Sequence, residues 1–112
     1  MTEVAKHSTL TSGRWQSFSL MEQLGNVGSE VGRAVRAKRV GNNERMWAAL
    51  ERALELIDLT IADPRWRERL KEPARARELI CDFLVGENEY GSTSESLNAY
   101  FLPFAVAARA TR

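Results

Sequence analysis

Apolar residues recur at alternating separations of three and four positions along most of the chain, which is the period of an amphipathic α-helix. The spacing predicts a first helix from about Arg14 to Arg39. Its apolar stripe comprises Leu20, Leu24, Val27, Val31 and either Ala34 or Val35. Residues 40–43 follow with a glycine suited to end this helix and asparagines that can cap the next one.

A second helix is predicted from about residue 43 to residue 62, and it has the clearest apolar pattern of the chain. The residues of this pattern are Trp47, Leu50, Leu54, Ile57 and Ile61. Asp63 and Pro64 end the helix, because the residue before a proline avoids the helical region of backbone space. So broad an apolar face indicates contact with more than one neighbouring helix.

Two further helices are predicted in the second half of the chain. Pro73 is tolerated at a first helical position and Gly86 can cap a C-terminus, so a third helix is expected between them. A capping box at residues 92–95 predicts a fourth helix that starts near Thr93. Pro103 is expected to kink or divide this helix, because it lacks the N–H that would bond to the preceding turn.

The helices account for nearly the whole chain. No segment alternates between apolar and polar residues with a period of two, so strands are not expected. The length of 112 residues fits one domain. We therefore predict an all-α fold: an antiparallel four-helix bundle over residues 14–112, preceded by a flexible, disordered tail over residues 1–13.

Three glycines interrupt the first predicted helix, each at a cost of about 1 kcal/mol relative to alanine. Gly25, Gly28 and Gly32 form one smooth ridge with Met21 beside the apolar stripe. Their spacing differs from the G-x-G-x-x-G of a dinucleotide site, and the G-x-x-G of a KH-type RNA clamp belongs beside strands. The ridge therefore predicts the close approach of another helix, either within the chain or at a dimer interface.

Charge, cysteine content and the length of the apolar runs limit the partners and the cellular location that we expect. The 16 basic and 15 acidic residues leave a net charge of +1, so attraction of a charged partner must come from local patches. The lone Cys81 cannot form an internal disulfide, and residues 1–14 lack the apolar core of a signal peptide. The apolar run at residues 99–108 is too short to span a bilayer. We therefore expect a cytoplasmic protein that is not inserted in a membrane.

Few residues suit catalysis or metal binding. His7 falls in the predicted tail and Cys81 beside a buried stripe, so neither a cysteine–histidine pair nor a zinc site is expected. Acidic residues on the first two helices are Glu22, Glu30, Glu51, Glu55 and Asp58.

The E-x-x-D at residues 55–58 resembles one element of the all-α pyrophosphatases of the MazG kind. Those enzymes hold magnesium with carboxylates from facing helices. The paired-glutamate element that should precede it is missing, because Glu22 is followed by Gln23, Leu24 and Gly25. Metal-dependent nucleotide pyrophosphohydrolysis is therefore only a second alternative, and no cofactor is expected.

Basic residues gather in two places. A first group interacts favourably with the macrodipole at the end of the first helix and comprises Arg33, Arg36, Lys38 and Arg39. A second group has no such explanation: Arg65, Arg67, Arg69 and Lys71 gather around Trp66. Guanidinium groups bind phosphates and an indole stacks on a base, so the predicted nucleic-acid contact comprises Arg65, Trp66, Arg67 and Arg69.

Four segments together resemble an uncharacterised bacterial family of short helical proteins: residues 19–34, 51–64, 76–84 and 88–101. The resemblance covers most of residues 14–109 and implies no activity. Small four-helix proteins such as the ribosomal intervening-sequence protein and retroelement accessory proteins are a more distant architectural analogy, and these oligomerise and bind nucleic acid.

We therefore expect a non-catalytic helical interaction module that self-associates as a homodimer. The reason is a surplus of large apolar residues over what one bundle seam needs: Trp15, Phe18, Met21, Trp47 and the aromatic residues of the fourth helix. Nucleic-acid binding is the alternative function, and another protein is the alternative partner.

Overall fold

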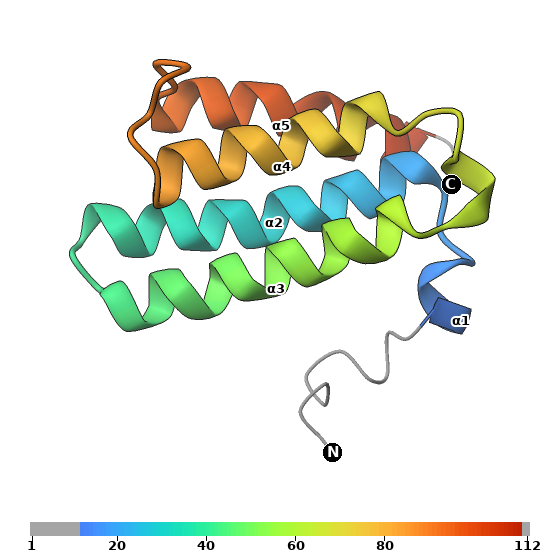
Figure 1. Ribbon diagram of the computed structural model, residues 1–112, viewed down its shortest axis with the longest axis horizontal. Coiled ribbons are helices and arrows are strands. Elements are labelled where there is room, and N and C mark those ends of the chain that lie inside the picture. The colour runs from blue at the N-terminus through green and yellow to red at the C-terminus, as the bar shows by residue number, and fades with distance from the viewer. Residues whose placement is uncertain (1–11, 111–112) are drawn as a thin grey trace.

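The computed structural model describes residues 12–110, which fold into five α-helices and one 3-10 helix and contain no strand (Figure 1). The all-α prediction is confirmed for this range. Most of the predicted tail, residues 1–11, lies outside the described residues, and its last two residues begin the first helix. The elements in chain order are α1 (Ser12–Trp15), α2 (Leu20–Arg39), α3 (Asn43–Ile61), η2 (Pro64–Trp66), α4 (Lys71–Leu84) and α5 (Ser94–Ala110).

The first predicted helix is divided into two. α1 ends at Trp15, and α2 starts at Leu20 because Ser19 caps its first turn. The Ser19 hydroxyl accepts a hydrogen bond from the Glu22 N–H at 3.1 Å, and the Glu22 carboxylate accepts one from the Ser19 N–H at 2.8 Å. This capping box satisfies two backbone donors, so the prediction of one continuous helix from Arg14 is wrong.

The remaining helices begin and end close to the predicted positions. The side chain of Asn42 caps α3 by accepting a bond from the Arg45 N–H at 3.0 Å. α4 starts at Lys71, slightly before Pro73. At α5 the cap differs from the predicted one: the Thr93 hydroxyl accepts from the Ser96 N–H at 3.0 Å, and the Ser96 hydroxyl accepts from the Thr93 N–H at 2.8 Å.

Pro103 lies inside α5, and the helix continues on both sides of it. The proline is exposed, as is Ala99 one turn earlier. Water can therefore bond the Ala99 carbonyl that Pro103 leaves without an N–H partner. Of the two predicted outcomes, a kink or a division, the division is wrong, and α5 presents one continuous outer face.

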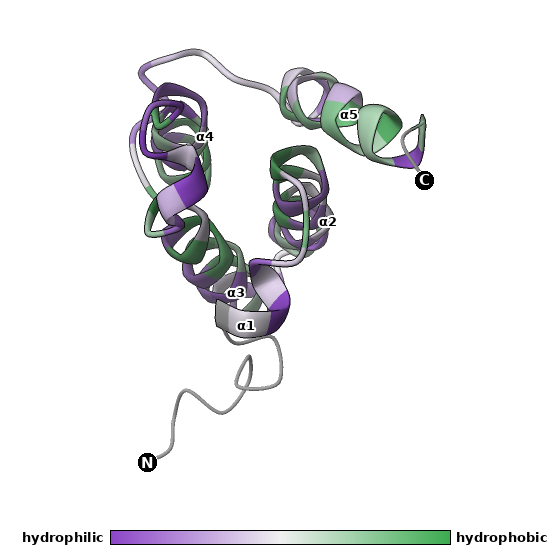
Figure 2. Ribbon diagram, turned by 90° about the vertical axis from the view of Figure 1, so that its right-hand side faces the viewer, coloured by the Kyte–Doolittle hydropathy of each residue, from purple (hydrophilic) through white to green (hydrophobic). Residues whose placement is uncertain are grey.

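α2 is the central helix of the fold. It packs most extensively against α3 and α5, whereas α4 packs against α3 and, to a smaller extent, α2. Figure 2 shows α3 and α5 on opposite sides of α2, with α4 above α3 on the left. α5 therefore depends mainly on α2 for its contacts.

The core lies among α2, α3 and α4 and is completed by α5. Its buried side chains include Val27, Leu50, Ile57 and Ile80, with Leu97 from α5. No helix within residues 12–110 combines the length and the apolar composition required to cross a membrane.

Candidate interaction face and arginine pocket

Two of the ridge glycines allow α2 and α5 to approach closely. A Cβ atom built on Gly28 would lie 2.8 Å from the Cβ of Phe101, too close for any residue except glycine without a shift. A Cβ atom on Gly25 would lie 3.4 Å from the Cα of Ala105. The close approach at these two positions is therefore made within the chain.

The other two members of the predicted packing or dimer interface lie differently. A Cβ atom on Gly32 would approach only the guanidinium of Arg36, at 3.5 Å, and Gly32 is half-buried. Met21 is also half-buried. Packing on α5 thus explains Gly25 and Gly28 but gives no reason for glycine at position 32.

The side of α5 that faces away from the core is apolar. Leu102 is 58% exposed and Val106 is 49% exposed, and Ala99 and Pro103 are exposed beside them. We call this surface, with Glu95 and Arg109 at its two ends, the outer face of α5. Where it meets α2 lies a groove of about 300 Å³, which is lined by Gly25, Gly28, Ser29, Asn98, Ala99, Phe101, Leu102 and Ala105.

The predicted surplus of apolar surface is therefore real but differs in composition. Trp15 is 1% exposed, and Trp47 lies on α3, where it is 49% exposed in spite of its place in the predicted apolar pattern, so neither contributes to this surface. Phe101 is buried, while Tyr100 and Phe104 are half-buried around it in edge-to-face contacts. The most exposed apolar residues of α5 are therefore aliphatic, because Phe101 packs against Gly28 of α2 and the other two rings pack beside it.

Among the predicted nucleic-acid contacts, Arg65 is bound within the chain. Its guanidinium donates to the Asp63 carboxylate at 2.7 Å and to the Phe18 carbonyl at 2.7 Å. The same group lies 4.4 Å from the ring centre of Trp66, a cation–π contact. These contacts fix Arg65 on η2 with much of its hydrogen-bonding capacity already used.

Trp66 also has an internal partner. Its indole N–H donates to the Gln23 side-chain oxygen at 3.0 Å, and the Gln23 amide donates to the Trp15 carbonyl at 2.8 Å and to Asp63 at 3.3 Å. The Trp15 indole N–H in turn donates to the Thr60 hydroxyl at 3.2 Å. Gln23, Thr60 and Asp63 are almost completely buried.

We call the group formed by Trp15, Gln23, Thr60, Asp63, Arg65 and Trp66 the buried polar cluster. It joins the start of α2 to the end of α3. The Arg65 side-chain hydrogen bonds hold the pKa of Asp63 below its ordinary value, against the opposing effect of burial. The cluster was not predicted, although Gln23 and Thr60 are polar residues on otherwise apolar helix faces, which is the sequence signal for such a group.

The last two predicted nucleic-acid contacts, Arg67 and Arg69, are exposed. Neither forms an ion pair within residues 12–110. The structure thus separates the predicted group into a bound half, Arg65 and Trp66, and a solvent-facing half.

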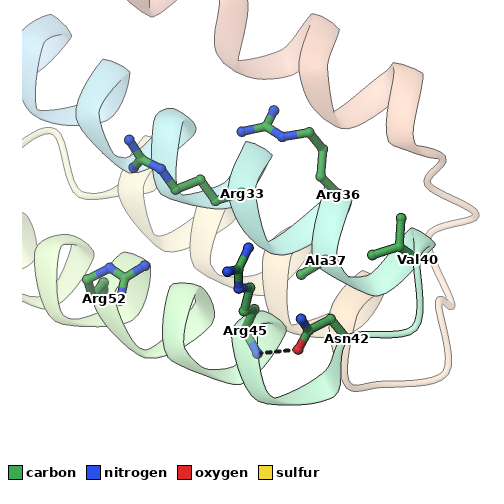
Figure 3. A pocket seen from close by; sticks show the side chains of 7 residues that line it. All are labelled: Arg33, Arg36, Ala37, Val40, Asn42, Arg45 and Arg52. Atoms are coloured by element: carbon green, nitrogen blue, oxygen red, sulfur yellow. Dashed lines mark hydrogen bonds between the residues drawn. The ribbon is translucent and has the colours of Figure 1, made fainter.

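Four other arginines surround a pocket of about 500 Å³ at the opposite end of the α2–α3 pair (Figure 3). Arg33 and Arg36 come from α2, whereas Arg45 and Arg52 come from α3. We call this site the arginine pocket. Its other lining residues are Ala37, Val40 and Asn42.

One carboxylate balances part of this charge. Glu30 accepts from Arg33 at 3.0 Å and from Arg52 at 3.1 Å. Neither Arg36 nor Arg45 forms an ion pair within the part of the chain that the structure describes. The pocket therefore has a local excess of positive charge in a nearly neutral protein.

Arg33 and Arg36 were explained by the helix macrodipole, and it was not predicted that Arg45 and Arg52 of α3 would line the same pocket. A signal was present, because Arg45 and Arg52 are seven residues apart and so lie on one face of a helix. The short connection at residues 40–42 then places the start of α3 beside the end of α2.

The carboxylates proposed for magnesium binding do not gather. Asp58 pairs with Arg77 at 3.0 Å, and both side chains are largely exposed. Within residues 12–110, no three His, Cys, Asp or Glu residues lie close enough together to hold a metal ion. His7 lies outside the described residues, and Cys81 is half-buried.

Comparison with known proteins gives no match to a family model, to a curated protein or to a solved structure. The resemblance to a bacterial family of short helical proteins therefore stays an expectation. Function must be inferred from the outer face of α5, the buried polar cluster and the arginine pocket.

Proposed function

We propose that this chain is an antiparallel four-helix bundle that works as a non-catalytic interaction module and forms a homodimer through the outer face of α5. The observation that supports it is the arrangement of that face, which has an exposed apolar centre and opposite charges at its ends.

The order of residues on this face favours a second copy of the chain as the partner. Glu95, Leu102 and Arg109 are spaced by seven residues, close to two helical turns, so they lie in one line along α5. In an antiparallel pair with its two-fold axis at Leu102, Glu95 of one copy meets Arg109 of the other. Both ends of the interface then hold an opposite-charge pair, as a symmetric interface requires.

The centre of the pair would be apolar. The two Leu102 side chains meet at the axis, and each Val106 lies opposite the small or short polar residues of the groove between α2 and α5. Removing the exposed part of each Leu102 and Val106 from water contributes on the order of 1 kcal/mol per side chain. A surface this small supports reversible association, roughly in the micromolar range.

Two valines of similar exposure provide a matched test. Val106 on the outer face is 49% exposed, and Val85 after α4 is 45% exposed. Sedimentation velocity should detect a dimer of the 12.6 kDa chain that Val106→Asp dissociates and Val85→Asp leaves intact. A wild-type chain that stays monomeric at tens of micromolar contradicts the proposal.

A charge exchange tests the register. Glu95→Arg alone places two arginines together at each end, and Arg109→Glu alone places two glutamates together, so each should weaken the dimer. The double variant restores opposite charges only if the helices pair antiparallel about Leu102. Recovery of the dimer in the double variant is the expected result, and a further loss would rule out this register.

The alternative, nucleic-acid binding through residues 65–69, has less structural support because Arg65 and Trp66 are held in the buried polar cluster. It now depends on Arg67 and Arg69. If it is correct, Arg67→Glu with Arg69→Glu should abolish retention on mixed nucleic acid at low salt without dissociating the dimer.

A further inference from the structure

We infer that the arginine pocket binds a compact group of linked phosphates, such as the diphosphate or triphosphate of a small molecule. The inference is independent of the proposed dimer, because the pocket is formed by α2 and α3 and the outer face belongs to α5.

The charge balance of the pocket points to an anion. Four arginines from two helices line it, and Glu30 accepts from only Arg33 and Arg52. Positive charges around one hollow repel one another, and a multiply charged anion relieves the repulsion. Guanidinium groups also present pairs of N–H donors that match the oxygens of a phosphate.

The junction between the helices adds an oriented amide. The Asn42 side-chain oxygen accepts from the Arg45 N–H at 3.0 Å, so its amide nitrogen is left as the donor end of that side chain. Figure 3 shows Asn42 beside Arg45 at the start of α3, below Ala37 and Val40 at the end of α2. The positive end of the α3 dipole and the negative end of the α2 dipole both lie beside the pocket, so the preference for an anion comes from the arginines.

The shape of the site favours a compact ligand over a polymer. The arginines line one hollow of about 500 Å³ instead of following a stripe across the surface. Its lining contains no aromatic ring on which a base could stack, since Ala37 and Val40 are its only apolar residues. Recognition should therefore end at the phosphates.

Calorimetric titration of the full chain with inorganic triphosphate at low salt tests the inference. We expect one triphosphate per chain and much weaker binding of orthophosphate. Arg36→Gln and Arg45→Gln should each weaken binding about tenfold or more, because each removes charged hydrogen bonds. Arg69→Gln removes an exposed arginine outside the pocket and should leave the affinity unchanged.

Further titrations identify which kind of molecule carries the phosphates. Nucleoside triphosphates that differ in base should bind as inorganic triphosphate does if recognition ends at the phosphates. Arg45→Lys keeps the charge but loses the paired donors, so it should bind more weakly than wild type. Circular dichroism of each variant checks that the helices are retained.

Three results would overturn the inference. The first is no binding of triphosphate to the folded wild-type chain, and the second is a loss of affinity in Arg69→Gln as large as in the pocket variants. A single-stranded oligonucleotide that binds more tightly than triphosphate and is not displaced by it would assign the surface to a polymer instead.

Discussion

The two halves of α2 differ in the groups that lie against their glycines and polar side chains. In the N-terminal half, Gln23 lies in the buried polar cluster and Gly28 lies against Phe101. In the C-terminal half, Gly32 has only the Arg36 guanidinium nearby, and that guanidinium lines the arginine pocket. The two glycines thus have different roles, and the group that lies against each of them decides which role it has.

Arginine shows the same contrast across the molecule. Arg65 lies beside the buried Asp63, which accepts its hydrogen bonds, whereas Arg45 lies beside other arginines. A buried acceptor makes the first arginine part of the fold, whereas the second forms no ion pair within residues 12–110 and is proposed to bind a phosphate group. The contrast predicts that substitutions at Asp63 or Arg65 change the free energy of unfolding strongly, whereas a substitution at Arg45 changes it little.

The largest effect is expected for Asp63→Ala. The change removes the acceptor of Arg65 and Gln23 at a site that is almost completely buried. We expect a loss of about 3 kcal/mol in the free energy of unfolding, less than for a fully buried ion pair because Arg65 is partly exposed. Urea unfolding at one fixed protein concentration measures it.

Asp58→Ala is the control for this change. Asp58 also pairs with an arginine, Arg77, but both side chains are exposed. Its loss should stay below about 1 kcal/mol, as for other surface ion pairs. Equal losses at the two positions would mean that burial of Asp63 does not matter.

Low pH should destabilise the protein through protonation of Asp63. The folded-state pKa of Asp63 is lowered by the Arg65 hydrogen bonds, while an unfolded aspartate titrates near 3.9. The stabilisation is therefore complete above the unfolded pKa and is lost as the pH falls through the lower folded value. Below pH 4, the wild type should lose more unfolding free energy than Asp63→Ala, and parallel pH profiles would contradict this assignment.

Alanine at two ridge positions should change stability in opposite directions. At Gly28 the new methyl group meets the Phe101 Cβ at 2.8 Å, so Gly28→Ala should cost about 1–3 kcal/mol. At Gly32 the nearest atom is the flexible Arg36 end at 3.5 Å, so Gly32→Ala should stabilise α2 by about 1 kcal/mol. Thermal melts of the two variants measure this difference. Equal shifts in melting temperature would show that α2 is packed equally tightly at both positions.

Much of the fold could be predicted because its signals are local. Apolar periodicity, the asparagines at residues 42 and 43 and Pro64 marked the ends of α3, although either asparagine could have been the cap. The division before α2 was missed although Ser19 and Glu22 form the S-x-x-E pattern of a capping box. Division at Pro103 was one of two predicted outcomes and is wrong, because Ala99 is exposed to water in the folded chain.

The candidate sites could be predicted less well because each depends on contacts between distant residues. Gln23 and Trp66 are separated by most of α2 and all of α3, and no local pattern joins them. Arg45 and Arg52 become part of a pocket only when α3 folds back beside Arg36. The outer face of α5 became evident once its aromatic residues were found to pack inward.

The smallest effect on stability is expected in the arginine pocket. Arg45→Gln removes one of several like charges and no ion pair within residues 12–110, so unfolding free energy should change by less than about 0.5 kcal/mol. Arg65→Gln loses most of the bonds to Asp63 and should cost about 1–2 kcal/mol. Urea unfolding of both variants in phosphate-free buffer separates the two roles. A loss at Arg45 as large as at Arg65 would mean that the pocket arginines hold the fold together, and a ligand would then not be needed to explain why they line one pocket.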